Sequence, residues 1–265
     1  MWSVARAQLY QLKKDFINPL VFFGLLLIEA ATMLIGVLTM LNEHLQNPTM
    51  PEPTAGELFI VQLSMPFFGA VFAIAVTATI CCSDFSDKTL NYELMTGHSR
   101  SDSFFARALL SLVFGIVGAA LLEFAPVCVL TAIYGWGENV IFRDAMLRGA
   151  LVLLPVARLI CEFVFISFLV KRRFAVMALG FVIIMLENSL PLFTESRSPL
   201  LAGTNINLLT YVNAWSSFGL QGNMHVVYEA AIPARDVLLT VAASVGFGAL
   251  FLFLGYVFFR HDDID

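Results

Sequence analysis

Four charged side chains lie well inside the long apolar runs of this sequence, and chemistry or ion movement in the middle of those runs would depend on them. They are Glu29, Glu123, Arg158 and Glu162. An ionisable group in hydrocarbon costs roughly 3 kcal/mol on insertion scales, so such groups face a bundle interior or a wet cavity. Arg158 and Glu162 stand one helical turn apart, so they can pair on one face of a helix.

These residues allow two interpretations. In the first they form a network that locks helices together, with Glu123 reaching Arg158. In the second they contact a transported substrate or relay protons. The apolar runs 59–82 and 237–259 carry no Asp, Glu, Lys, Arg or His. This pattern argues against an ion pore formed by the chain alone.

Sequence motifs for catalysis are absent. The sequence contains no GxxxxGK[ST] run, no HExxH and no GxSxG, and its four histidines are scattered through predicted loops. We therefore assign no catalytic residue, metal ligand or cofactor to the chain itself. A process powered by ATP would need a separate ATPase.

The elements that position these residues follow from composition. Of the 265 residues, 59% are hydrophobic and 13% are charged, whereas a soluble domain carries about a quarter charged residues. The chain is therefore predicted to be an integral membrane protein. Its formal net charge of -5 argues against binding of nucleic acid, which needs a basic face. The four cysteines lie in or beside apolar runs without metal-binding spacing, which is typical of buried thiols.

We expect an all-α, polytopic membrane protein with one domain, residues 1–265. A spanning helix needs roughly 20 predominantly apolar residues. Six ranges meet this requirement, the fifth less clearly because its far end is polar: 20–41, 59–82, 104–134, 147–170, 174–193 and 237–259. In the connection before the last span, residues 206–220 predict a re-entrant or surface-lying helix.

Residues 1–18 predict an amphipathic helix in the headgroup plane of the membrane. Gln8 and Gln11 fall on its polar face, and Asn18-Pro19 ends it before the first span. The apolar stripe recurs every three or four residues: Trp2, Ala5, Leu9, Leu12 and Phe16.

Loop charges predict the orientation. With the N-terminus inside, four basic residues lie outside: Arg143, Arg148, Arg197 and Arg235. Ten of the 15 basic residues then lie inside: Arg6, Lys13, Lys14, Lys88, Arg100, Arg107, Lys171, Arg172, Arg173 and Arg260. By the positive-inside rule, both termini and the stretch 83–104 are expected in the cytoplasm.

The stretch 83–104 is the longest charged, turn-rich interval between two apolar runs. Ser86 can cap a helix of about three turns that Gly97 ends. On a helical wheel, Leu90 and Leu94 lie nearly opposite the face that carries Phe85, Tyr92 and Met95. Two apolar faces favour contact with the bundle on one side and a protein partner on the other. An ordinary amphipathic connector is the alternative.

This stretch, SDFSDKTLNYELMTGHSRSDSFFAR, resembles the coupling segment in membrane subunits of ABC-2-type (type V) ABC exporters. The resemblance extends to the N-terminal interfacial helix, the six spans and the long outer connection. One departure is Asn91, where the family carries an acidic residue, with Glu93 further on. The matching residues are Asp84, Phe85, Lys88, Thr89, Leu90, Gly97, Ser99 and Arg100.

The resemblance implies a permease in the cell (inner or plasma) membrane that dimerises and binds two separately encoded ATPase subunits, which hold ATP and Mg²⁺. It implies export of a small hydrophobic or cationic peptide or drug-like molecule. The coupling helix would dock on the ATPase through Asp84, Phe85, Lys88, Thr89, Leu90, Glu93, Leu94 and Arg100. Two alternatives stay open: a proton-coupled secondary transporter, and a non-transporting membrane protein that confers immunity to a peptide.

Overall fold

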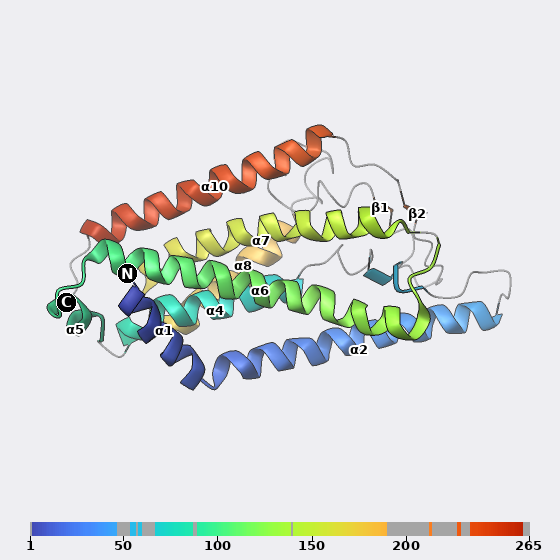
Figure 1. Ribbon diagram of the computed structural model, residues 1–265, viewed down its shortest axis with the longest axis horizontal. Coiled ribbons are helices and arrows are strands. Elements are labelled where there is room, and N and C mark those ends of the chain that lie inside the picture. The colour runs from blue at the N-terminus through green and yellow to red at the C-terminus, as the bar shows by residue number, and fades with distance from the viewer. Residues whose placement is uncertain are drawn as a thin grey trace.

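A computed structural model describes residues 2–46, 54–56, 58–59, 67–86, 89–138, 140–189, 212–213, 227–228 and 234–261. Within them lie eight named helices and one small pair of strands (Figure 1). The helices are α1 (Trp2–Lys14), α2 (Ile17–Gln46), α4 (Phe67–Ser86), α5 (Thr89–Met95), α6 (Arg100–Tyr134), α7 (Phe142–Val170), α8 (Arg173–Ser189) and α10 (Ala234–His261). The strands β1 (Val212–Asn213) and β2 (Val227–Tyr228) pair antiparallel. The rest of the predicted re-entrant segment 206–220 lies outside the described residues.

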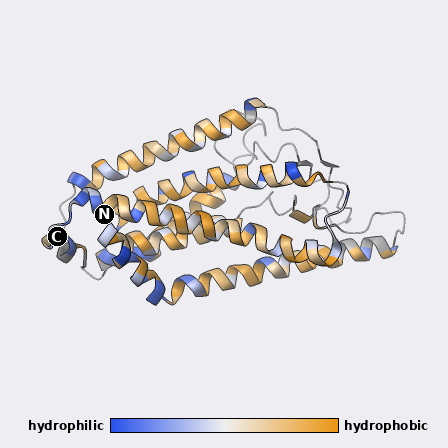
Figure 2. Ribbon diagram, viewed as in Figure 1, coloured by the Kyte–Doolittle hydropathy of each residue, from blue (hydrophilic) through white to orange (hydrophobic). Residues whose placement is uncertain are grey.

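The protein is an all-α, multi-pass membrane protein. Five of the described helices are long and apolar enough to cross a bilayer, and Figure 2 shows hydrophobic residues along most of their length. The five candidate spans are Ile17–Thr39, Phe67–Phe85, Arg100–Tyr134, Phe142–Val170 and Val237–His261. The polar residues of α1 and of the α4–α6 connection gather at one end of the bundle. We call this the α5 end.

The expectation of six spans is met only in part. The described part of the range 174–193 lies in α8, which has 17 residues and a length of about 26 Å at 1.5 Å per residue. That falls short of the roughly 30 Å hydrocarbon core, because the polar sequence from Glu187 onward ends the apolar run. Residues 190–193 lie outside the described residues.

Helix α4 forms the centre of the bundle and packs against α2, α6, α7 and α8. Its small residues let neighbouring backbones approach closely, as is common between helices in membranes. A Cβ at Gly69 would stand 3.1 Å from the Cβ of Ala119 on α6. The last helix, α10, lies outermost along α7.

The break between α1 and α2 comes earlier than expected. Asn18 and Pro19 lie in the first turn of α2, where the missing N–H of a proline costs no hydrogen bond. Asp15 makes the break, because its Oδ1 accepts a 2.9 Å hydrogen bond from the backbone N–H of Ile17. Its Oδ2 also pairs with Arg173 Nη1 of α8 at 3.0 Å, so the junction is tied to the α7–α8 turn.

Candidate functional site

Helix α5 lies at the end of the bundle where α1 begins and α10 ends (Figure 1). It is shorter than predicted, because α4 continues to Ser86 and α5 starts only at Thr89. Ser86, the predicted cap, is instead the last residue of α4. The end of the helix is as expected: Gly97 has φ +92° and donates its N–H to Leu94 O at 3.1 Å. Asp87 and Lys88 lie outside the described residues.

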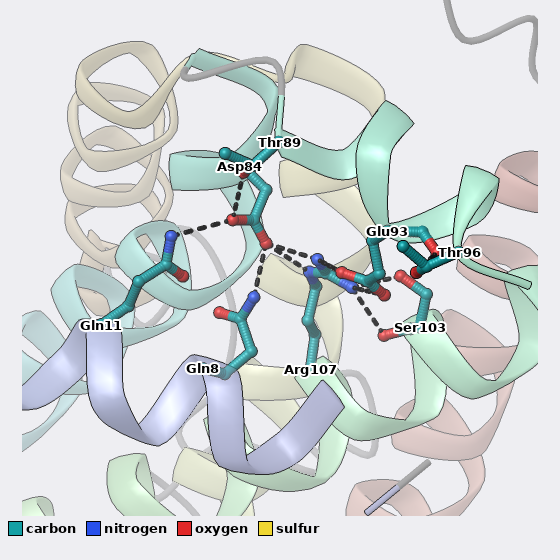
Figure 3. A network of polar contacts seen from close by, with 8 residues as sticks. All are labelled: Gln8, Gln11, Asp84, Thr89, Glu93, Thr96, Ser103 and Arg107. Carbon is teal, nitrogen blue, oxygen red and sulfur yellow. Dashed lines mark hydrogen bonds and ion pairs between the residues drawn. The ribbon is translucent and has the colours of Figure 1, made fainter. Parts of the chain in front are cut away.

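One guanidinium holds α5 to the bundle. Arg107 of α6 is fully buried, and Figure 3 shows it between the carboxylates of Asp84 on α4 and Glu93 on α5. Its Nε lies 3.2 Å from Asp84 Oδ2, and its Nη2 also pairs with that oxygen. Nη2 lies 2.7 Å from Glu93 Oε2, and Nη1 lies 3.3 Å from Glu93 Oε1.

Ser103 completes the surroundings of Arg107. Its backbone carbonyl accepts from Nη1 at 3.1 Å, and its Oγ accepts from the same nitrogen. Every guanidinium nitrogen thus has at least one acceptor. Planar, charge-assisted contacts of this kind are stronger than neutral hydrogen bonds, and burial makes the loss of either partner costly.

Asp84 connects this cluster to the N-terminal helix. It accepts hydrogen bonds from Gln8 Nε2 and Gln11 Nε2 of α1, the second at 3.1 Å, and from Thr89 Oγ1 of α5 at 2.8 Å. We call these seven residues the Arg107 network: Gln8, Gln11, Asp84, Thr89, Glu93, Ser103 and Arg107. It joins α1, α4, α5 and α6 at one point.

Some apolar residues in and beside α5 are buried in the bundle, and others are exposed on its surface. Leu90 is buried in the main core together with Phe104 and Phe168. Phe85 at the end of α4 is half-buried, with its ring 6.0 Å from that of Phe168. Met95 is 83% exposed. The helix therefore has one side fixed in the bundle and one side open.

Arg100 ties the start of α6 to the end of α10. Its Nη1 lies 3.3 Å from the carbonyl oxygens of both Phe259 and Arg260. Ser101 Oγ and Tyr256 Oη lie 3.0 Å apart on the same two helices. Forces on the α5 turn can thus reach α10 as well.

The predicted docking residues fall into groups of different exposure. Asp84 and Leu90 are buried within the chain, and Thr89 is exposed. The half-buried ones are Phe85, Glu93, Leu94 and Arg100. Lys88 lies outside the described residues.

Sequence reasoning did not assign Arg107 or Gln8 to the site. Arg107 was counted only among the inner basic residues, although it falls within the predicted span 104–134, where a charge requires a partner. Gln8 was placed on the polar face of the N-terminal helix, yet its side chain is buried. The i, i+4 relation between Ser103 and Arg107 was the one local signal available.

The intramembrane charges form two separate groups. Arg158 Nη1 lies 3.4 Å from Glu162 Oε2, as the spacing predicts, and Arg158 Nη2 lies 2.6 Å from Glu187 Oε1 of α8. The expected contact between Glu123 and Arg158 is wrong, because Arg158 is paired on α7 and α8. Glu187, which sequence reasoning noted only as a polar span end, completes this group.

Glu29 of α2 and Glu123 of α6 form the second group, and both are buried. Glu123 Oε1 faces α4, where a Cβ at Gly69 would stand 3.3 Å away. Its Oε2 accepts no hydrogen bond from the described residues. The two carboxylates thus lie in the interior rather than toward lipid.

Among the described residues, no three His, Cys, Asp or Glu side chains gather in a way that could hold a metal ion. What this end of the molecule offers is mechanical: a short helix with an exposed side, joined to several spans by a buried ion-pair network. Comparison with protein-family models and with curated proteins finds no match for this chain.

Proposed function

We propose that this chain is the membrane-spanning permease subunit of an ATP-driven exporter of the ABC-2 (type V) kind. The observation that carries the proposal is the attachment of α5. The Arg107 network links α5 to α4, α6 and α1 through buried, charge-assisted contacts. A push on the exposed side of α5 would therefore move the spans and not only a loop. This is what a docking helix for an ATPase requires.

The proposal includes six crossings. Helix α2 begins at the α5 end and α10 finishes there, which supports an even number of crossings. Five of the described helices are long enough by themselves. We assign the sixth crossing to α8, whose last turn carries Glu187 paired with Arg158.

We infer that the protein lies in the cell membrane with its α5 end facing the cytoplasm. The elements at that end are α1, the start of α6, the α7–α8 turn and the end of α10. They carry Arg6, Lys13, Lys14, Arg100, Lys171, Arg172, Arg173 and Arg260. The opposite helix ends carry fewer, namely Arg143, Arg148 and Arg235. The positive-inside rule then puts both termini inside.

The working unit would be two permease copies with two ATPase subunits, which supply ATP and Mg²⁺. Within the described helices, the charged residues furthest from the helix ends are predominantly acidic: Glu29, Glu123 and Glu162 against Arg158. This balance favours a small cationic or hydrophobic peptide, or a drug-like cation, as the exported substrate.

The test is co-purification of the tagged chain from its native host in mild detergent, followed by mass spectrometry and an ATPase assay. We expect an ABC ATPase to accompany the wild-type chain and the Met95→Leu variant, and to be lost with Met95→Asp. Met95 suits this test because it is exposed, whereas an acidic residue at the buried Leu90 would unfold the chain. A wild-type chain that brings no ATPase would overturn the proposal.

A proton-coupled transporter is the second candidate, favoured by the buried carboxylates of Glu29 and Glu123. Transport in vesicles separates the two functions. Export that continues after ATP depletion and stops when the proton gradient collapses would support the second candidate and exclude the first.

A further inference from the structure

A pocket lies between α1 and α5, and five members of the Arg107 network line it: Gln8, Gln11, Asp84, Thr89 and Glu93. Its volume is about 410 Å³, within the range of about 300–1,000 Å³ that is usual for ligand sites. Helix α1 forms one wall, and the end of α4, α5 and the turn after α5 form the other. The residues that matter for its chemistry are Gln8, Gln11, Asp84, Glu93, Thr96 and His98.

The pocket carries negative charge. The Arg107 network contains one guanidinium and two carboxylates, so one negative charge is left over. Asp84 and Glu93 line the pocket, while Arg107 does not. Arg6 of α1 also lies outside the lining, with its guanidinium carbon 5.5 Å from the ring centre of Trp2.

The pocket also has hydrogen-bond acceptors to spare. Gln11 Oε1 is buried and receives no hydrogen bond from the described residues. The amide orientation is well defined, because Gln11 Nε2 must be the atom that donates to the Asp84 carboxylate. Each oxygen of Glu93 accepts one hydrogen bond from Arg107 and has capacity for another.

A negative charge beside unsatisfied acceptors fits a cation with several N–H donors. A guanidinium or an ammonium group meets both requirements, whereas a carboxylate or phosphate would be repelled. The exposed side chain of Met95 directly precedes Thr96 of the lining. A protein that covers Met95 would therefore bring its own surface over the pocket.

We propose that this pocket receives an arginine or lysine side chain of the protein that docks on α5. The inference rests on the proposed function, because the docking protein would be the ATPase subunit. The basic side chain would bind Glu93, beside Gln11, and so connect the partner to the Arg107 network. Helix α1 thereby becomes half of the docking site.

Three substitutions at Thr96 isolate charge from size: Thr96→Lys, Thr96→Gln and Thr96→Glu. Thr96 is exposed, and within the described residues its Oγ1 donates to the backbone carbonyl of Glu93, at 2.7 Å, so all three variants lose the same contact. The probe is the ATPase that co-purifies with the wild-type chain, and its dissociation constant is measured for each variant in detergent. Equal melting temperatures of the three variants establish that folding is unchanged.

We expect Thr96→Lys to bind the ATPase about tenfold or more weakly than Thr96→Gln, because like charges would meet in the pocket. Thr96→Glu should bind at least as tightly as Thr96→Gln. Equal or tighter binding of Thr96→Lys would overturn the pocket proposal while leaving the permease function standing. A wild-type chain that binds no ATPase would overturn both.

Discussion

Arg107 of α6 and Asp84 of α4 form an ion pair with almost no solvent contact, at 0% and 4% side-chain exposure. Such a pair is costly to desolvate, and replacing both partners with apolar residues can be neutral. The role of this ion pair is to connect helices. Asp84 also binds α1 and α5, and Arg107 also binds Glu93, so four helices share one charged centre.

Removing Arg107 should destabilise the protein strongly. Arg107→Gln leaves Asp84 buried without its cation, for which we expect a loss of about 3–5 kcal/mol. The measurement is thermal unfolding in detergent. Arg172→Gln, which removes an exposed arginine near the same end, is the matched control and should change little. Comparable melting temperatures for the two variants would contradict the central role of the pair.

Gln8 should hold the N-terminal helix in place. Gln8→Ala removes a buried donor to Asp84, at an expected cost of about 1–2 kcal/mol. Hydrogen exchange of the α1 amides should then accelerate more than exchange in α7. Asn42→Ala, which truncates an exposed amide on α2, serves as the control. Unchanged protection of α1 in Gln8→Ala would mean that other contacts hold this helix.

Arg107 and Gln8 show which features of the site could not be predicted from the sequence. Length and apolar composition predicted the five long helices, because the bilayer imposes them on any spanning segment. The burial of Gln8 could not be predicted in this way, because its partner Asp84 lies 76 positions away. A helical wheel assigns polar residues to the exposed face of a helix. A polar side chain can be buried only where a partner satisfies its hydrogen bonds, and a helical wheel does not show a partner that is distant in sequence.

The same limit applies to the intramembrane charges. The pair of Arg158 and Glu162 was predictable from local spacing. The contact with Glu187 depends on how α8 packs against α7, and the wrong contact with Glu123 was inferred from charge alone. The shortness of α8 follows from Glu187 and the polar residues after it, a signal that was present in the sequence.

The Arg158 group should respond differently to the loss of each member. Arg158→Gln leaves Glu162 and Glu187 as two uncompensated acids inside the membrane, which is costly. Glu162→Gln and Glu187→Gln each leave one neutral ion pair, so they should destabilise much less. Melting temperatures in lipid nanodiscs rank the three variants by stability, and Arg158→Gln should be the least stable. Finding either acid variant less stable than Arg158→Gln would show that the group is not an isolated triad.

Cysteine labelling tests the six crossings. In a Cys128→Ser background, single cysteines at Arg172 and His261 should react from the same side of sealed cells, and one at Arg143 from the other. All three positions are exposed. On our orientation, the membrane-impermeant reagent added outside labels only Arg143→Cys. Labelling of Arg172→Cys and His261→Cys from opposite sides would exclude a crossing by α8.

Close packing of α4 against α6 gives a sharp test with a matched pair of glycines. A Cβ at Gly118 would stand 1.9 Å from Cε1 of Phe72, whereas one at Gly24 meets nothing within 4 Å. Gly118→Ala must displace the Phe72 ring or the helix, at about 1–3 kcal/mol or more. Gly24→Ala should instead stabilise α2 by up to about 1 kcal/mol, because alanine favours the helix. Thermal unfolding should therefore shift in opposite directions for the same chemical change. A Gly118→Ala protein as stable as Gly24→Ala would mean that α4 and α6 lie further apart than described.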